Sequence, residues 1–217
     1  MSHLISVLLS PTPAALDYKH RGMIRALLLI FDPSGRWEAL KAAQPSVARV
    51  SAVSLIPLVL LTAAAEAYLI MRLGIDRGTI SIKLIQPAPA LLARYELAQL
   101  FSSLLIVYLG AAGLQKIGIS FHRRHSYREC FTMLAYSITP LLLARVASGF
   151  PALNTWACYG VGAFLMLSLF YRGIPFILRP DPSNALGLCV FCSVLMLGST
   201  ALTHYLARLV LEEKLFV

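Results

Sequence analysis

The chain has 217 residues, of which 58% are hydrophobic and 13% are charged, and it carries a formal net charge of +9 at pH 7. Soluble globular domains have about 25% charged residues, so this composition excludes most soluble enzymes and favours a protein embedded in a membrane. No run exceeds two adjacent basic residues. We therefore interpret the basic excess as loops that face anionic lipid headgroups, and we expect no nucleic-acid partner.

Residues 1–22 form a segment unlike the rest of the chain, and we expect it to be disordered or dispensable. Its apolar run Leu4–Leu9 is short and has no Lys or Arg before it, which does not fit a cleavable signal peptide. Met23 begins a nearly continuous apolar run. Translation from Met1 and translation from Met23 are therefore both open.

Residues 23–49 predict a cytoplasmic or interfacial amphipathic segment. Ser34 is a typical N-cap residue and precedes a short helix that we expect over Gly35–Ala43. Trp37 and Leu40 share one face of that helix, because residues three apart are neighbours on a helix surface. Two interpretations are open: the helix lies in the membrane interface, or it packs on another part of the protein.

Five long apolar stretches dominate the rest of the chain, and about 17–25 apolar residues suffice to cross a hydrocarbon core as a helix. We bound them at residues 50–71, 97–114, 130–150, 155–171 and 185–206. No linker divides them, so residues 50–217 are expected to form one membrane domain. The predicted fold is all-α: a polytopic bundle of five transmembrane helices with a short interfacial N-terminal helix.

Twelve of the 19 Lys and Arg residues lie on the side of the N-terminus, before the first stretch and in the loops after the second and fourth. Cytoplasmic loops carry an excess of Lys and Arg. This distribution predicts a multi-pass protein of the bacterial inner membrane with its N-terminus in the cytoplasm and its C-terminus outside.

Glu66 is the only acidic residue well inside one of these stretches, where a charge costs a few kcal/mol. Glu66 and Arg145 each lie five residues before the end of a stretch that is expected to run outward. Because their depths match, we hypothesise that they pair. Three alternatives are open: Glu66 is protonated, Glu66 is solvated near the outer interface, or Arg145 extends outward to water.

The third stretch carries further polar side chains. Thr132, Tyr136 and Thr139 recur at helical spacing, so we expect one polar stripe that faces other helices and joins a candidate intramembrane polar cluster with the two charges. Pro140 and Pro57 each remove a backbone donor from a helix interior and predict kinks in the third and first stretches.

Basic and aromatic side chains on the predicted cytoplasmic side are candidate contacts for lipid headgroups or for a protein partner: Trp37, His122, Arg123, Arg124, His125 and Arg128.

No cofactor, metal or catalytic site is expected. Two histidines flank adjacent arginines that repel a cation, and Cys189 with Cys192 forms only half of a zinc site. Nucleophile-elbow, Walker-type and dinucleotide motifs are missing from the sequence. We therefore expect a protein that is not an enzyme.

Three groups of residues carry a resemblance to the Yip family, the Ypt/Rab-interacting membrane proteins, in a compact bacterial form. They are the Pro and Trp entry around residues 30–37 and 44–46, the Tyr-Ser-x-x-Pro sequence at 136–140, and the Tyr-x-Gly exit at 171–173 with the polar turn at 181–186. The resemblance extends over residues 24–210. It implies a five-helix bundle with a cytoplasmic N-terminus, and eukaryotic members are associated with vesicle traffic, GTPase binding and membrane curvature. It supplies no catalytic residue.

The expected function is that of a non-enzymatic scaffold, adaptor or membrane-organising factor with a cytoplasmic partner surface. Its expected partners are the lipid bilayer, anionic headgroups and other proteins of the same membrane. The alternative is a transporter, or a subunit of an export machine, with a polar path near Glu66 and Arg145.

Overall fold

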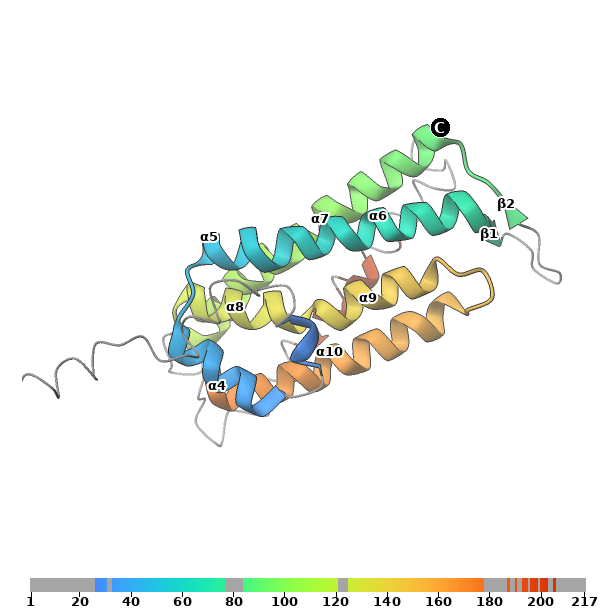
Figure 1. The fold of residues 1–217 in the computed structure, drawn as a ribbon. Coiled ribbons are helices and arrows are strands. Elements are labelled where there is room, and N and C mark those ends of the chain that lie inside the picture. The colour runs from blue at the N-terminus through green and yellow to red at the C-terminus, as the bar shows by residue number, and fades with distance from the viewer. Residues whose placement is uncertain are drawn as a thin grey trace, which may run out of the picture.

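The computed structural model describes residues 26–30, 33–76, 84–120 and 125–177, together with scattered positions between 187 and 205 (Figure 1). The described elements are almost entirely helical. In chain order the helices are α4 (Pro33–Ala43), α5 (Val47–Val50), the π-helical turn η1 (Ser51–Leu55), α6 (Ile56–Leu73), α7 (Pro89–Ser120), α8 (Tyr127–Ser137), α9 (Thr139–Ser148) and α10 (Thr155–Ile177). Between α6 and α7, β1 (Ile75–Asp76) pairs antiparallel with β2 (Leu84–Ile85).

Four described segments are long and apolar enough to cross a membrane as helices. They are Val47–Leu73, Pro89–Gly118, Tyr127–Ser148 and Thr155–Ile177. These segments correspond to the first four predicted spans, although the second begins at Pro89 and not at residue 97. The fifth predicted span, at 185–206, lies largely outside the described residues. Residues 1–22 and Met23 lie wholly outside them.

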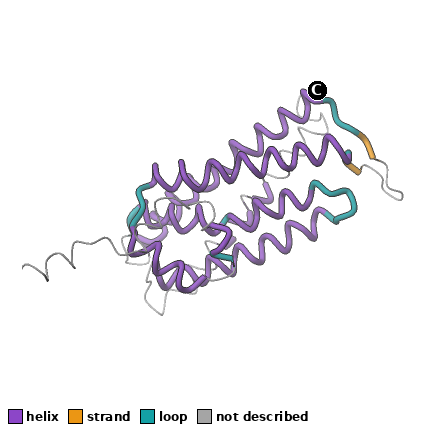
Figure 2. The backbone as a smooth tube through the Cα atoms, viewed as in Figure 1, coloured by secondary structure: helices purple, strands orange, loops and turns teal. Residues whose placement is uncertain are grey.

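The third span is the centre of the bundle. Within its most apolar window 83% of the residues are buried, against 33–44% in the other three segments. Figure 2 shows the long helices as two neighbouring pairs, α6 with α7 and α9 with α10. Because α8 packs on α7 and α10, and α9 packs on α6 and α10, the third span contacts each of the other three.

The two prolines at which kinks were predicted each lie beside a boundary between helical elements. Pro57 lies in the first turn of α6, directly after the π-helical turn η1. Pro140 lies in the first turn of α9, and Ile138 separates α9 from α8. A proline is well tolerated in the first turn of a helix.

Helix α4 packs on α10 at the end of the bundle where α8 begins. Trp37 has no exposed surface and Leu40 is 3% exposed, whereas Glu38 on the opposite face is exposed. The expected N-cap is wrong, because the helix begins at Pro33 and Ser34 is already inside it. The fixed φ of a proline is suited to a first helical position. The packing fits the second interpretation of this helix, contact with the rest of the protein.

Candidate intramembrane charge cluster

Three ionisable side chains from three helices meet in the interior of the bundle. Arg145 on α9 donates from Nε to Oε2 of Glu66 on α6, and from Nη2 to Oε2 of Glu96 on α7. The side chains of Arg145 and Glu66 are each 3% exposed, and that of Glu96 is 13% exposed. One guanidinium group therefore joins two carboxyl groups that belong to different spans.

Two polar residues of α7 extend this charge cluster of Glu66, Glu96 and Arg145. Tyr95 donates its hydroxyl proton to Oε1 of Glu66 at 3.0 Å, and Gln99 Nε2 donates to the Tyr95 oxygen at 3.4 Å. Both residues are buried. Each oxygen of Glu66 thus accepts a hydrogen bond, one from a neutral donor and one from a charged donor.

The positions of these residues along the chain explain why they meet. Glu66 lies seven residues before the end of α6 at Leu73, and Glu96 lies seven residues after the start of α7 at Pro89. At 1.5 Å per residue each is about 10 Å from the connection between the two helices. Since α6 and α7 are antiparallel neighbours, their carboxyl groups reach the same depth.

The hypothesised pairing of Glu66 with Arg145 is present in the structure. Glu96 was missed, because it lies just outside an apolar stretch that was bounded at residue 97. The equal distances of Glu66 and Glu96 from the interhelical connection depend on the helix bounds that the structure gives.

The three residues of the predicted polar stripe do not all lie near the charge cluster. Thr132, Tyr136 and Thr139 are all buried, as expected. Thr132, however, donates to the carbonyl of Arg128 at 2.8 Å within its own helix. It also lies thirteen residues before Arg145, about 20 Å along the helices. The structure therefore places Thr132 near the α4 end of the bundle and the charges near the opposite end.

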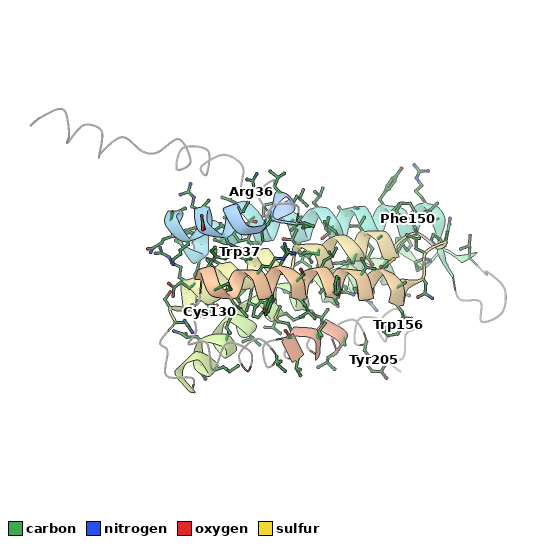
Figure 3. All side chains as sticks on the ribbon, turned by 90° about the horizontal axis from the view of Figure 1, so that it is seen from below. Arg36, Trp37, Cys130, Phe150, Trp156 and Tyr205 are labelled. Atoms are coloured by element: carbon green, nitrogen blue, oxygen red, sulfur yellow. The ribbon has the colours of Figure 1, made fainter. Side chains whose placement is uncertain are left out.

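The candidate surface residues have different positions. Trp37 is fully buried against the rest of the chain, so its side chain is not available for the headgroup or partner contact that was predicted for it. Figure 3 shows Trp37 on α4, away from the end at which Phe150 and Trp156 lie. His125 is 8% exposed. His122, Arg123 and Arg124 lie outside the described residues.

Arg128 connects the start of α8 with the turn that follows α4. Its Nη2 donates to Oε1 of Gln44 at 3.0 Å. Gln44 has a φ of 39°, in the left-handed region where helices commonly end. A pocket of about 260 Å³ opens here, and it is lined by Leu40, Lys41, Gln44, Pro45, Ser126, Arg128, Glu129, Thr132 and Ile177. We name it the α4–α8 pocket.

Glu129, one helical turn after His125, has a structural partner. Ser126 and Glu129 form a reciprocal cap at the start of α8, in which Glu129 Oε2 accepts from Ser126 N at 3.0 Å and Ser126 Oγ accepts from Glu129 N at 3.2 Å. Such a capping box satisfies two helix-terminal donors. Among the described residues, no group of three His, Cys, Asp or Glu side chains is placed to hold a metal ion.

Long apolar helices around a buried charge cluster define a polytopic α-helical membrane protein. The profile of the Yip1 domain matches residues 27–203, which include every helix described above and the whole charge cluster. The chain therefore belongs to the Yip family. Searches of curated proteins and of solved structures gave no match.

Proposed function

We propose that this protein is a non-enzymatic scaffold, adaptor or membrane-organising factor of the bacterial inner membrane. In this proposal the N-terminus and α4 face the cytoplasm and the C-terminus lies outside, as the distribution of Lys and Arg favours. Membership of the Yip family supports this class of function.

The observation that carries the proposal is the contrast between the interior of the bundle and its α4 end. The cavity that borders Arg145 has a volume of about 30 Å³, roughly that of one water molecule. The α4–α8 pocket is about 260 Å³ and opens to the surface. Within the described residues, a partner has far more room at the α4 end than among the spans.

The lining of the α4–α8 pocket suits a partner with an anionic group beside apolar surface. Half-buried Lys41 and Arg128 supply two positive charges against the one negative charge of Glu129, whose carboxylate caps α8, and buried Leu40 and Ile177 supply apolar contact. A phospholipid headgroup with the start of its acyl chains has this chemistry. We therefore propose that anionic lipid occupies the pocket and that protein partners assemble around the same end.

Site-specific photo-crosslinking in native membranes tests the proposal. A photo-crosslinking amino acid in place of Lys41 is expected to capture a defined membrane protein together with anionic lipid. The matched control replaces Phe101, which is 67% exposed on α7 in the middle of a span, and is expected to capture bulk lipid. Equal protein capture at both positions would contradict a partner surface at the α4 end.

The buried charge cluster favours one second candidate, a transporter or a subunit of an export machine. Ionisable residues inside membrane spans commonly mark ion or substrate pathways. Glu66→Gln would then abolish transport while the protein stays folded. Unchanged flux in reconstituted vesicles would instead leave the charge cluster with a structural role.

A further inference from the structure

The charge cluster contains more acidic groups than basic ones. Glu66 from α6 and Glu96 from α7 face Arg145 from α9. Among the described residues, the other polar groups that face them are neutral: Tyr95 and Gln99 from α7, and Tyr159 from α10, which lines the small cavity beside Arg145. With both carboxyl groups ionised, the charge cluster would carry a net charge of −1 inside the membrane, where an uncompensated charge is costly.

The two carboxyl groups are not equivalent. Both oxygens of Glu66 accept hydrogen bonds, from Tyr95 and from Arg145. Only one oxygen of Glu96 does so, and its other oxygen, Oε1, is buried without a partner among the described residues. A buried anion is stabilised by donors at both oxygens. Glu66 is therefore the better site for the negative charge, and Glu96 is the better site for a proton.

The small cavity does not change this assignment. Arg145 Nη1 is also buried without a partner among the described residues. Arg145 borders the cavity of about 30 Å³ together with Gln99, Ser103, Tyr159 and Thr200. A polar cavity of this size accommodates a water molecule that can accept from Nη1. Glu96 is not among the residues that line the cavity.

We infer that the charge cluster is a proton-binding site within the membrane, which holds one proton on Oε1 of Glu96 at neutral pH. With the proton on Glu96, Glu66 stays ionised and paired with Arg145, so the charge cluster as a whole is neutral. This inference is independent of the partner surface proposed above, since it concerns the opposite half of the bundle.

Infrared spectroscopy of the full-length protein in lipid vesicles tests the inference. A protonated carboxyl group has a C=O stretching band that is distinct from the bands of a carboxylate. The wild-type protein is expected to show this band at pH 7. Glu96→Gln is expected to abolish it, and Glu66→Gln is also expected to abolish it, because one carboxylate then matches one guanidinium. The control Glu38→Gln, at an exposed position on α4, is expected to retain it.

A shorter side chain identifies which carboxyl group holds the proton. Glu96→Asp is expected to shift the frequency of the band, whereas Glu66→Asp is expected to leave the frequency unchanged. A shift in Glu66→Asp alone would overturn the assignment to Glu96. The spectrum of the wild-type protein requires no variant to fold, and the lack of a protonated carboxyl band in it at pH 7 would overturn the whole inference.

Discussion

The indole ring of Trp37 on α4 lies directly over Gly173 on α10. A Cβ atom at position 173 would come within 2.9 Å of two ring carbons, closer than real Cβ contacts. Trp37 is fully buried, so its ring cannot move outward without loss of this packing. The contact between Trp37 and Gly173 therefore holds α4 against the membrane bundle. Because α4 forms one wall of the α4–α8 pocket, the same contact also positions that wall.

Gly173→Ala is expected to destabilise the folded protein by about 1–3 kcal/mol, the usual cost of overpacking a filled interior. The matched control is Gly160→Ala on the same helix, where an added Cβ meets nothing within 4 Å. This control should be neutral or slightly stabilising, because Ala is about 1 kcal/mol better than Gly in a helix. Thermal unfolding in detergent measures both variants, and equal melting temperatures would contradict close packing between Trp37 and Gly173.

Removal of the ring tests the same contact from the other side. Trp37→Ala is expected to cost about 3–5 kcal/mol through the cavity that it leaves. It should also increase proteolysis within α4, because the helix loses its main anchor. If a partner protein binds at the α4 end, its capture should decrease as the exposure of α4 to protease increases. Protease sensitivity that matches the wild type would show that other residues hold α4 in place.

Glu66→Gln and Arg145→Gln are expected to be strongly non-additive. Arg145→Gln leaves Glu66 buried without its countercharge, which costs about 3–5 kcal/mol. Glu66→Gln is expected to cost less, because Glu96 can then ionise and pair with Arg145. In the double variant both charges are gone, so the destabilisation should be smaller than the sum by about 0.5–3 kcal/mol. Arg94→Gln, at an exposed position on α7, serves as the control and should be additive with Glu66→Gln. Additivity in the first pair would show that the contact contributes nothing.

The charge cluster illustrates which features a sequence can reveal. The depth of Glu66 and Arg145 follows from helical rise alone, so their pairing was predictable. Glu96 lies in a polar turn of α7 that still belongs to the helix, and Tyr95 and Glu96 of that turn contact Glu66 on α6 and Arg145 on α9. Apolar stretches define where lipid contact is possible, and they do not define where a helix begins.

The partner of α4 illustrates the opposite case. The spacing of Trp37 and Leu40 indicates a buried face, but spacing does not determine which surface covers that face. Gly173 is separated from Trp37 by almost the whole bundle in sequence, and only the folded chain brings them together. A glycine in an apolar helix is too common to identify such a contact in advance.

Gly162 provides a second close contact, between α9 and α10. A Cβ at position 162 would lie 2.5 Å from the Cβ of Ala144. Gly162→Ala is therefore expected to be more destabilising than Gly173→Ala. Ala144→Gly in the same protein removes the opposing atom and should restore most of the loss in thermal stability. A double variant no more stable than Gly162→Ala would place the clash elsewhere, for example at the carbonyl of Pro140, 3.2 Å away.

The proposed orientation predicts opposite labelling of the two ends of the bundle. Ala42 is exposed on α4, and Asn154 is exposed in the turn between α9 and α10. The background is a protein without its native cysteines, Cys130, Cys158, Cys189 and Cys192. In intact spheroplasts, a membrane-impermeant maleimide is expected to label Asn154→Cys immediately and Ala42→Cys only after permeabilisation. The reverse pattern would invert the orientation.

Loss of positive charge at the α4–α8 pocket should weaken the binding of anionic lipid. Each basic residue near an anionic surface contributes about 1 kcal/mol. The combined variant Lys41→Gln and Arg128→Gln is therefore expected to reduce the affinity for phosphatidylglycerol by at least about tenfold, as measured by native mass spectrometry, with little effect on phosphatidylcholine.

Two controls separate charge from structure in that experiment. Gln44→Ala removes the hydrogen bond of Arg128 but no charge, and should retain most of the lipid. Arg94→Gln removes a charge from the first turns of α7, far along the helix from the α4–α8 pocket, and should also retain it. An equal loss in Arg94→Gln would mean that the lipid responds to the overall charge of the protein. An equal loss of phosphatidylglycerol binding in Gln44→Ala would instead show that the position of the Arg128 side chain matters. Lipid binding would then depend on the shape of the pocket.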